Sequence, residues 1–270
     1  MGAIYAWATD RCGFDWRAGE EWKVMGLAAL GQSDEGVTQV LRDLVRIENG
    51  RPMAGSAEAL EMARQAVAPF ERARGDGDVE KAADLTASAQ AAFADLADQM
   101  LEVALAGSIG NLLLSGGCAL NSAYNGIVRR RFGLQAVHVP SAPADDGTAI
   151  RAAIAAWLED HPDRELPQCR TPFLGSAVRP SAVDALARNL AGCEIERTGD
   201  VSARRVADLL AAGKIAGVMR GRAEFGPRAL GNRSILADST RADMQGHDQC
   251  AGKGVRGLSS LCSDHSRRGR

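Results

Sequence analysis

The 270-residue sequence has few aromatic residues, no excess of basic residues and no long apolar run, and each absence excludes a class of protein. Aromatic residues make up 4% of the chain and the formal net charge is −2, which argues against a nucleic-acid-binding surface. No apolar stretch approaches the roughly 20 residues that a membrane-spanning helix needs. The first residues also lack the basic and apolar segments of a secretory signal. We therefore expect a cytoplasmic protein whose partners include neither nucleic acid nor a membrane.

The sequence also lacks paired cysteines, which argues against a disulfide framework or a zinc site. Scattered single thiols are typical of a reducing compartment. A hydrophobic content of 46% over this length suits one large domain or two smaller ones, each with a core. The six cysteines are Cys12, Cys118, Cys169, Cys193, Cys250 and Cys262.

Short apolar runs alternate with helical segments along the chain, and this alternation predicts an α/β architecture. We expect buried strands at Asn111–Leu114 and Ile215–Met219, and a third strand at Val137–Val139. The Ala-rich segment Ser56–Leu105 predicts two or three helices that are separated by a turn at Gly75 and Gly77. The other expected helices are a short one within Gly19–Gly31, one from about Leu120, and those at Thr148–Leu158, Val183–Leu190 and Val201–Ala212.

Three arginines lie close together in the segment Gly221–Asp238, which glycines and a proline keep from being helical. The planar guanidinium groups of Arg222, Arg228 and Arg233 suit phosphate or carboxylate ligands, and Glu224 could hold one of them in place. An ordinary solvated basic loop is the alternative. The apolar run before the segment favours a positioned loop, and we expect it to bind a phosphate or an acyl phosphate.

A second candidate site begins at Ser115-Gly116-Gly117, where an expected strand passes into a helix. Backbone N–H groups at such a turn, together with the helix dipole, can bind a phosphate. A turn that serves packing alone would explain the glycines equally well.

Three sequence blocks follow one another along the chain. The first is GEEWKVMGLAALG at Gly19–Gly31, and the second is SGGCALNSAYNG at Ser115–Gly126, followed by Pro140–Ala153. The third is the arginine-rich GRAEFGPRALGNRSIL. In this order the blocks resemble the O-carbamoyltransferases that modify nodulation factors and antibiotics. The resemblance extends from about Tyr5 to Met244, and three ordered blocks are far more specific than one.

The resemblance implies a fold as well as a family. Residues 1–165 would form the C-terminal part of an actin-like ATPase domain (ASKHA, tRNA-threonylcarbamoylation type), and residues 181–244 would begin a YrdC-like α/β domain. Residues 166–180 would link the two, and residues 245–270 would form a tail unlike the family.

The resemblance further implies carbamoyl transfer from carbamoyl phosphate, through an ATP-dependent carbamoyl adenylate, to a hydroxyl group of a sugar or secondary metabolite. Arg222, Arg228 and Arg233 would then be the catalytic residues. The residues that would bind the nucleotide or its phosphates are Gly116, Gly117, Asn121 and Lys214, although Lys214 also suits a plain surface role. The alternative is a non-catalytic remnant that at most binds nucleotide.

Asp145 aligns with the family's metal-binding aspartate. In the family, this aspartate and two histidines of an HxxxH motif hold a divalent metal, which is expected to be iron. That motif is absent, and His138 more naturally ends a strand. Asp145 and Asp146 could instead cap the helix that follows. Cys118 is expected to pack rather than to act as a nucleophile.

The family's histidine motifs would precede the first residue, so we expect the chain to lack half of the actin-like domain and to self-associate through exposed surface. The residues after Met244 differ from the family. Reading from Gln245 one base out of frame permits DxIN and FRPFA segments in the family's register, which predicts a frameshift.

Overall fold

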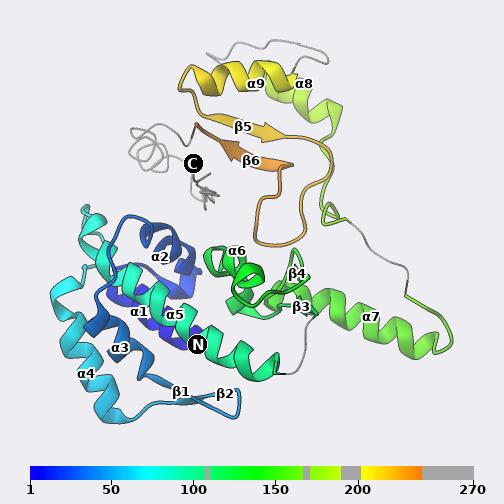
Figure 1. The fold of residues 1–270 in the computed structure, drawn as a ribbon. Coiled ribbons are helices and arrows are strands. Elements are labelled where there is room, and N and C mark those ends of the chain that lie inside the picture. The colour runs from blue at the N-terminus through cyan, green and yellow to red at the C-terminus, as the bar shows by residue number, and fades with distance from the viewer. Residues whose placement is uncertain (107–109, 167–170, 190–201, 239–270) are drawn as a thin grey trace. The chain divides into compact units, whose positions relative to one another are not determined.

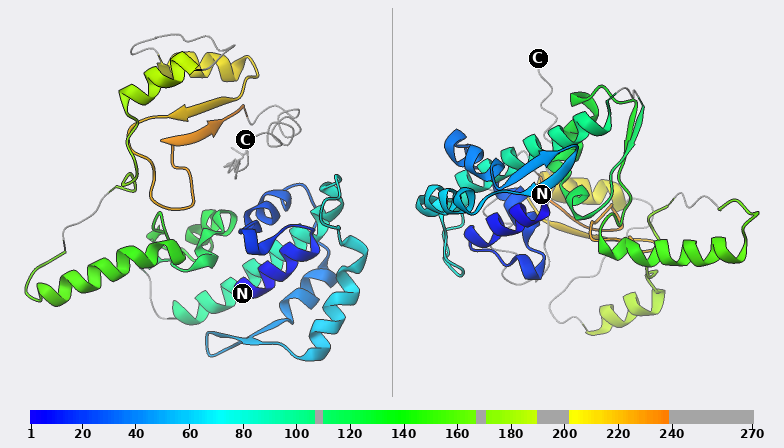
Figure 2. Two further views of the ribbon diagram at one scale, coloured as in Figure 1. Left: turned by 180° about the vertical axis from the view of Figure 1, so that it is seen from behind. Right: turned by 90° about the horizontal axis from the view of Figure 1, so that it is seen from below.

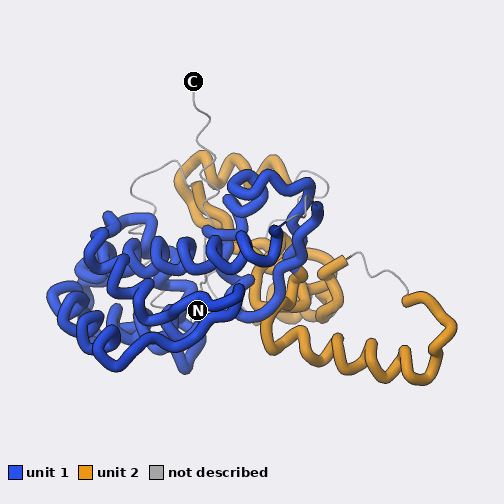
Figure 3. The backbone as a smooth tube through the Cα atoms, turned by 60° about the horizontal axis from the view of Figure 1, so that its bottom comes forward, with its two compact units in different colours: residues 1–139 blue, residues 140–270 orange. Residues whose placement is uncertain are grey.

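The structure is a computed structural model that describes residues 1–106, 110–166, 171–189 and 202–238 (Figure 1). The chain divides into two compact units, Met1–Val139 and Pro140–Arg270, and each is described by itself (Figure 3). Figure 2 gives two further views of the same elements.

The first unit is built around one long helix, α5, which spans Ala83–Ala104 and contacts the three helices α1, α2 and α3. Alanine and leucine favour a helix over this length, and buried residues recur along it. Leu85 of α5 is fully buried, as are Val24 and Leu41 of the helices packed on it. The helices around α5 are α1 (Gly2–Arg11), α2 (Glu21–Leu27), α3 (Glu35–Arg42), α4 (Ala57–Val67) and α6 (Ser122–Arg131).

Two pairs of short strands complete this unit. Strands β1 (Val45–Glu48) and β2 (Arg51–Ala54) form an antiparallel hairpin. Its turn, Asn49-Gly50, has positive φ at both residues, as a two-residue hairpin turn requires. Strands β3 (Asn111–Leu113) and β4 (Ala136–His138) are parallel, and α6 connects them. Single 3-10 turns lie at Trp16–Ala18, Ala68–Phe70, Glu80–Ala82 and Gly117–Leu120.

The second unit places an antiparallel strand pair beside helices. Strands β5 (Ala216–Met219) and β6 (Arg233–Leu236) pair so that Met219 lies opposite Arg233. The arginine-rich segment therefore connects the two strands of a hairpin. The helices of this unit are α7 (Thr148–Asp160), which a 3-10 turn at Asp145–Gly147 precedes, α8 (Pro180–Asn189) and α9 (Ser202–Ala211).

The mixed α/β architecture is confirmed, and the expected helices and strands lie within a few residues of their predicted positions. The prediction of buried strands is wrong, because Leu113 in β3 and Met219 in β5 are 65% and 67% exposed. Within the described residues, none of the helices is long and apolar enough to cross a membrane. The actin-like and YrdC-like assignments stay predictions, and the expected tail at residues 245–270 lies outside the described residues.

Candidate functional site

The first candidate site is the glycine turn, which we define as Ser115–Asn121, between β3 and α6. Gly116 has φ +95° and ψ 165°, a conformation that essentially only glycine adopts. Gly117 and Cys118 are exposed, and within the described residues their N–H groups make no hydrogen bond. Two such backbone donors on a fixed turn can bind an anion.

Asn121 lies at the end of the glycine turn, where its side chain caps α6. Its Oδ1 accepts a hydrogen bond from the Tyr124 N–H at 3.0 Å. Its amide also forms a reciprocal pair with Gln90 of α5, with distances of 2.9 and 3.2 Å. The Tyr5 hydroxyl of α1 donates to the same Gln90 oxygen at 2.9 Å. The side chain of Asn121 therefore fixes the turn to the core.

Aromatic rings pack beside this amide pair. Phe93 of α5 makes edge-to-face contacts with Tyr5 and Tyr124, with ring centroids 5.5 and 5.8 Å apart. The Tyr124 hydroxyl donates to the Asp98 carboxylate at 2.8 Å, and Arg131 pairs with the second Asp98 oxygen. Burial, together with the bond to Asp98, raises the pKa of Tyr124. Helices α1, α5 and α6 thus hold the glycine turn jointly.

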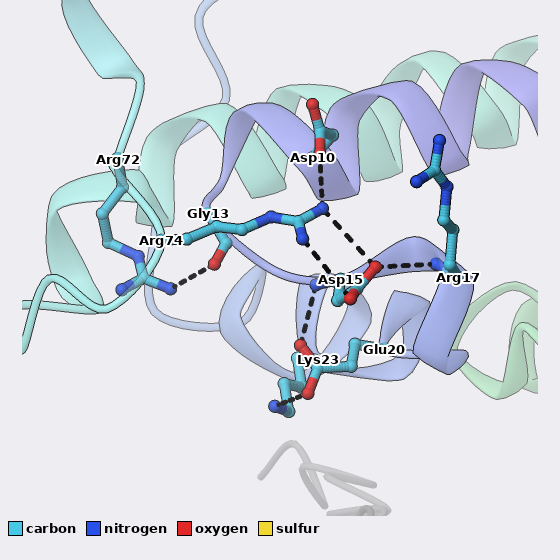
Figure 4. Close-up of polar contacts among 8 residues, drawn as sticks. All are labelled: Asp10, Gly13, Asp15, Arg17, Glu20, Lys23, Arg72 and Arg74. Carbon is cyan, nitrogen blue, oxygen red and sulfur yellow. Dashed lines mark hydrogen bonds and ion pairs between the residues drawn. The ribbon is translucent and has the colours of Figure 1, made fainter.

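Charged residues around the start of α2, among them Glu20 and Lys23 of the first block, are also paired (Figure 4). Arg74 contacts Asp10 at 2.8 Å and Asp15 at 3.3 Å, and the Asp15 N–H donates to Glu20. Glu20 in turn pairs with Lys23, as the dashed lines show. These side chains hold the turn that precedes α2.

The second candidate site is the arginine loop, Arg220–Asn232, which connects β5 to Arg233, the first residue of β6. Oε1 of Glu224 accepts hydrogen bonds from the N–H groups of Leu230, Asn232 and Arg233 at 2.7, 2.7 and 3.2 Å. Partial burial would raise the pKa of Glu224, but these backbone donors outweigh it and lower the pKa to about 2. The sequence indicated that Glu224 could hold a guanidinium group, and in the structure its Oε1 binds the backbone of the loop.

The predicted arginines have different surroundings. Arg222 is exposed, and one terminal nitrogen donates to the Leu174 carbonyl at 2.7 Å. Arg228 is partly buried. Arg233 donates to four backbone carbonyls, two of which belong to Arg220 and Ser176.

Part of the segment that was expected to be a linker packs on the arginine loop. Ala177 pairs with Arg222 in an antiparallel bridge, and the Gly175 N–H donates to the Ala223 carbonyl at 2.9 Å. On the loop itself, Gly226 has φ +124°, and a Cβ atom at this position would lie 1.9 Å from the Ser141 carbonyl oxygen. Only a glycine fits this close approach.

The remaining predicted residues are not brought into a cluster. Asp145 is exposed, and its backbone carbonyl accepts a hydrogen bond from the Thr148 hydroxyl. In the described part of the chain, no group of three His, Cys, Asp or Glu side chains could hold a metal ion. Lys214 is exposed just before β5, and His138 ends β4 as expected. Cys118 is exposed, so the expectation that it packs is wrong.

Three residues that shape these sites were not singled out from the sequence. Gln90 could have been suspected because it is a polar residue within an Ala-rich helical segment. Asn232 follows a glycine in the arginine block, where a turn-stabilising amide is common. Arg220 directly precedes that block, and only the structure shows what orients it.

Comparison with known proteins gives two family matches in order along the chain. Residues 1–154 match the carbamoyltransferase N-terminus, and residues 207–248 match the carbamoyltransferase C-terminus. The glycine turn falls within the first match and the arginine loop within the second.

Several curated relatives are similar over much of the chain. Nodulation protein NolNO of Sinorhizobium fredii is 34% identical over 81% of this chain and 32% of its own length. Nodulation protein NolO of Bradyrhizobium diazoefficiens is 31% identical over 83% of this chain and 41% of its own length. Nodulation protein U of Azorhizobium caulinodans is 38% identical over 50% of this chain and 22% of its own length. The chain therefore spans less than half the length of these relatives.

Proposed function

The chain belongs to the carbamoyltransferase family, and on that premise we propose that it transfers a carbamoyl group from carbamoyl phosphate to a hydroxyl group of a sugar or another small molecule. ATP would activate the group as carbamoyl adenylate. The observation that carries the proposal is the placement of two candidate phosphate-binding elements, the glycine turn and the arginine loop, in the two family segments in the expected order.

The proposed reaction begins at the arginine loop. Water cleaves carbamoyl phosphate to carbamate and phosphate, and a carbamate oxygen then attacks the α-phosphorus of ATP. The bond to the β-phosphate breaks, so pyrophosphate leaves and carbamoyl adenylate remains. Guanidinium groups from Arg222 and Arg228 would stabilise the negative charge that develops on the phosphoryl oxygens. Arg233 would support the same site by holding the loop backbone through its bonds to four carbonyl oxygens.

The second half of the reaction consumes the adenylate. The acceptor hydroxyl oxygen attacks the carbamoyl carbon, AMP leaves, and the hydroxyl proton passes to solvent. The free N–H groups of Gly117 and Cys118 would bind a nucleotide phosphate, and Gly116 provides the turn that exposes them. Asn121 would contribute by holding this turn. Lys214, which is exposed just before β5, would bind a nucleotide phosphate through its ammonium group.

The residues present do not form a metal site. Asp145 is an exposed carboxylate, and the described residues hold no cluster of metal-ligating side chains around it. A divalent cation needs several such ligands in fixed geometry. We therefore derive no step through a metal.

The test is pyrophosphate release by the full chain incubated with ATP and carbamoyl phosphate. We expect release to require both compounds and to fall about 100-fold in Arg222→Gln and in Arg228→Gln, since each removes a charged donor. Arg204→Gln is the control, because Arg204 is an exposed arginine on α9, outside the loop. Carbamoylated product with a panel of hydroxylated sugars would then identify the acceptor. Absence of pyrophosphate release in the wild type would leave a chain that at most binds nucleotide.

A further inference from the structure

The arginines of the second unit differ in how much of each guanidinium group the protein already uses. Nη1 of Arg233 donates to the carbonyl oxygens of Arg220 and Asn232 at 2.6 and 2.8 Å. Nη2 donates to the carbonyl oxygens of Ser176 and Gly221 at 3.0 and 3.3 Å. Both terminal nitrogens thus bind backbone, and the side chain joins the two strand ends to the segment near Ser176.

Arg220 has the opposite arrangement. Its Nε donates to Oδ1 of Asn232 at 3.1 Å, which fixes the plane of the guanidinium group. Its backbone N–H donates to the Asn232 carbonyl at 3.0 Å, which fixes the start of the side chain. The side chain is exposed, and among the residues that the structure describes its two terminal nitrogens have no hydrogen-bond or ion-pair partner. Arg220 is oriented and still has its terminal donors available.

Asn232 connects this arginine to the next one along the loop. It is 9% exposed, and its Nδ2 donates to the Arg222 carbonyl at 2.8 Å. The backbone N–H of Asn232 donates to Glu224, so hydrogen bonds hold both its backbone and its side chain. One terminal nitrogen of Arg222 donates to the Leu174 carbonyl, and among the described residues its other side-chain donors have no partner. One buried amide therefore sets the positions of two exposed arginines.

We propose that Arg220 is a further ligand-contacting residue of the arginine loop, which binds the phosphate group together with Arg222, and that Arg233 is a positioning residue. This inference rests on the proposed function, because it names the groups that bind the phosphate of carbamoyl phosphate. A bidentate guanidinium group matches two phosphate oxygens, and a guanidinium whose plane is already fixed loses little freedom on binding. Because both terminal nitrogens of Arg233 donate to backbone carbonyl oxygens, its guanidinium group holds the strand ends together.

The experiment is calorimetric titration of the full chain with carbamoyl phosphate and, separately, with inorganic phosphate, well below the melting temperature. Arg220→Gln is expected to raise the dissociation constant about 10- to 100-fold and to lower the melting temperature only slightly, because it removes exposed charged donors and a single hydrogen bond, that from Nε to Asn232. Arg220→Lys is expected to retain part of the affinity, since an ammonium group still binds phosphate as a point charge. Arg204→Gln is the matched control with unchanged affinity.

Arg233 is expected to behave differently under the same substitutions. Arg233→Lys should weaken binding as much as Arg233→Gln, because an ammonium group cannot bridge four carbonyl oxygens. Both variants should also speed hydrogen exchange at the Arg220 amide in the absence of ligand, a readout that does not depend on the proposed function. A purely structural Arg233 would lower the melting temperature and leave the dissociation constant unchanged.

The outcomes separate the two claims. If the wild-type chain binds neither compound, the proposed function fails at this loop and the inference fails with it. If the wild type binds and Arg220→Gln binds equally well, the assignment of Arg220 is wrong while the proposed function stands. If Arg233→Lys binds like the wild type with an unchanged Arg220 amide, Arg233 contacts the ligand by charge and the positioning role is wrong.

Discussion

The glycine turn and the arginine loop are two candidate phosphate sites that the protein supports in different ways. The glycine turn offers neutral backbone donors, and buried side chains from distant helices hold it through Gln90 and Asn121. The arginine loop offers charged donors, and it is held largely by its own residues, above all Glu224 and Asn232. One site depends on a core, whereas the other depends on a local hydrogen-bond network.

This difference separates the polar groups that we propose to bind a ligand from the polar residues that position them. Each site ends at a nearly buried asparagine, Asn121 in the glycine turn and Asn232 in the arginine loop. The side-chain oxygen and nitrogen of both asparagines form hydrogen bonds within the protein. The groups left for a ligand are the exposed N–H groups in one site and guanidinium groups in the other. Ligand binding at the arginine loop should therefore weaken more with added salt, because charged contacts at an exposed surface are screened.

The largest effect is expected from removing the core beneath the glycine turn. Phe93→Ala should lower the free energy of unfolding of the first unit by about 3–5 kcal/mol, because Phe93 is 7% exposed and lies between Tyr5 and Tyr124. Leu230→Ala in the arginine loop should change stability by about 0.5 kcal/mol at most, since Leu230 is 47% exposed. Urea unfolding followed by circular dichroism measures both. Equal effects would mean that the arginine loop also rests on a core.

The next effect concerns the backbone of the glycine turn. Gly116→Ala should destabilise the first unit by about 1–3 kcal/mol, because a Cβ atom is strained at φ +95°. Gly117→Ala is the matched control, since Gly117 has no positive φ and a Cβ atom there meets no neighbour within 4 Å. Thermal unfolding of the two variants side by side measures the difference. A turn that tolerates both alanines would not be a fixed anion site.

A smaller effect is expected at the amide pair that anchors the turn. Gln90→Ala should lower stability by about 1–2 kcal/mol, because the nearly buried Asn121 amide loses its partner. Gln99→Ala is the control on the same helix, where the side chain is exposed. If the two variants unfold alike in urea, Gln90 does not anchor the turn.

The helices and strands that were predicted from the sequence depend on local patterns, whereas α1, α3, the hairpin of β1 and β2, and β6 were not predicted. The Ala-rich segment that became α5 and the glycine turn that precedes α6 both carry their signal within a few residues. Burial could not be predicted in the same way. The apolar runs of β3 and β5 are typical of buried strands, yet within the described residues each pairs with a single short strand, and Leu113 and Met219 stay exposed.

The candidate sites could be located from the sequence, but the roles within them could not be assigned. Residue type alone predicts that Arg220, Arg222 and Arg233 can all bind phosphate. Their contacts differ, because the Arg233 side chain donates to the carbonyl of Ser176, far away in the sequence, whereas among the described residues the Arg220 side chain donates to Asn232 alone. Likewise the Gln90–Asn121 pair joins residues 31 positions apart. Such contacts depend on tertiary structure.

The smallest predicted effect tests the local support of the arginine loop through pH. The pKa of Glu224 is lowered from 4.5 to about 2 in the folded chain, so its ionised form is favoured by folding. Its contribution is therefore complete above pH 4.5 and is lost as the pH falls from there towards 2. The protection factor of the Asn232 amide, which donates to Glu224, should fall over this interval. In Glu224→Gln the same amide should show no such pH dependence.

The Tyr124 amide in the first turn of α6, directly after the glycine turn, is the internal control, because its acceptor is the neutral side chain of Asn121. Its protection factor should stay constant while that of Asn232 falls, as hydrogen exchange read out by mass spectrometry or NMR would show. A parallel fall at both amides would indicate acid unfolding of the whole chain, and no fall at either would mean that Glu224 does not hold the loop by its charge. A fall at Asn232 alone would show that the arginine loop is held by an ionised group and the glycine turn by a neutral one.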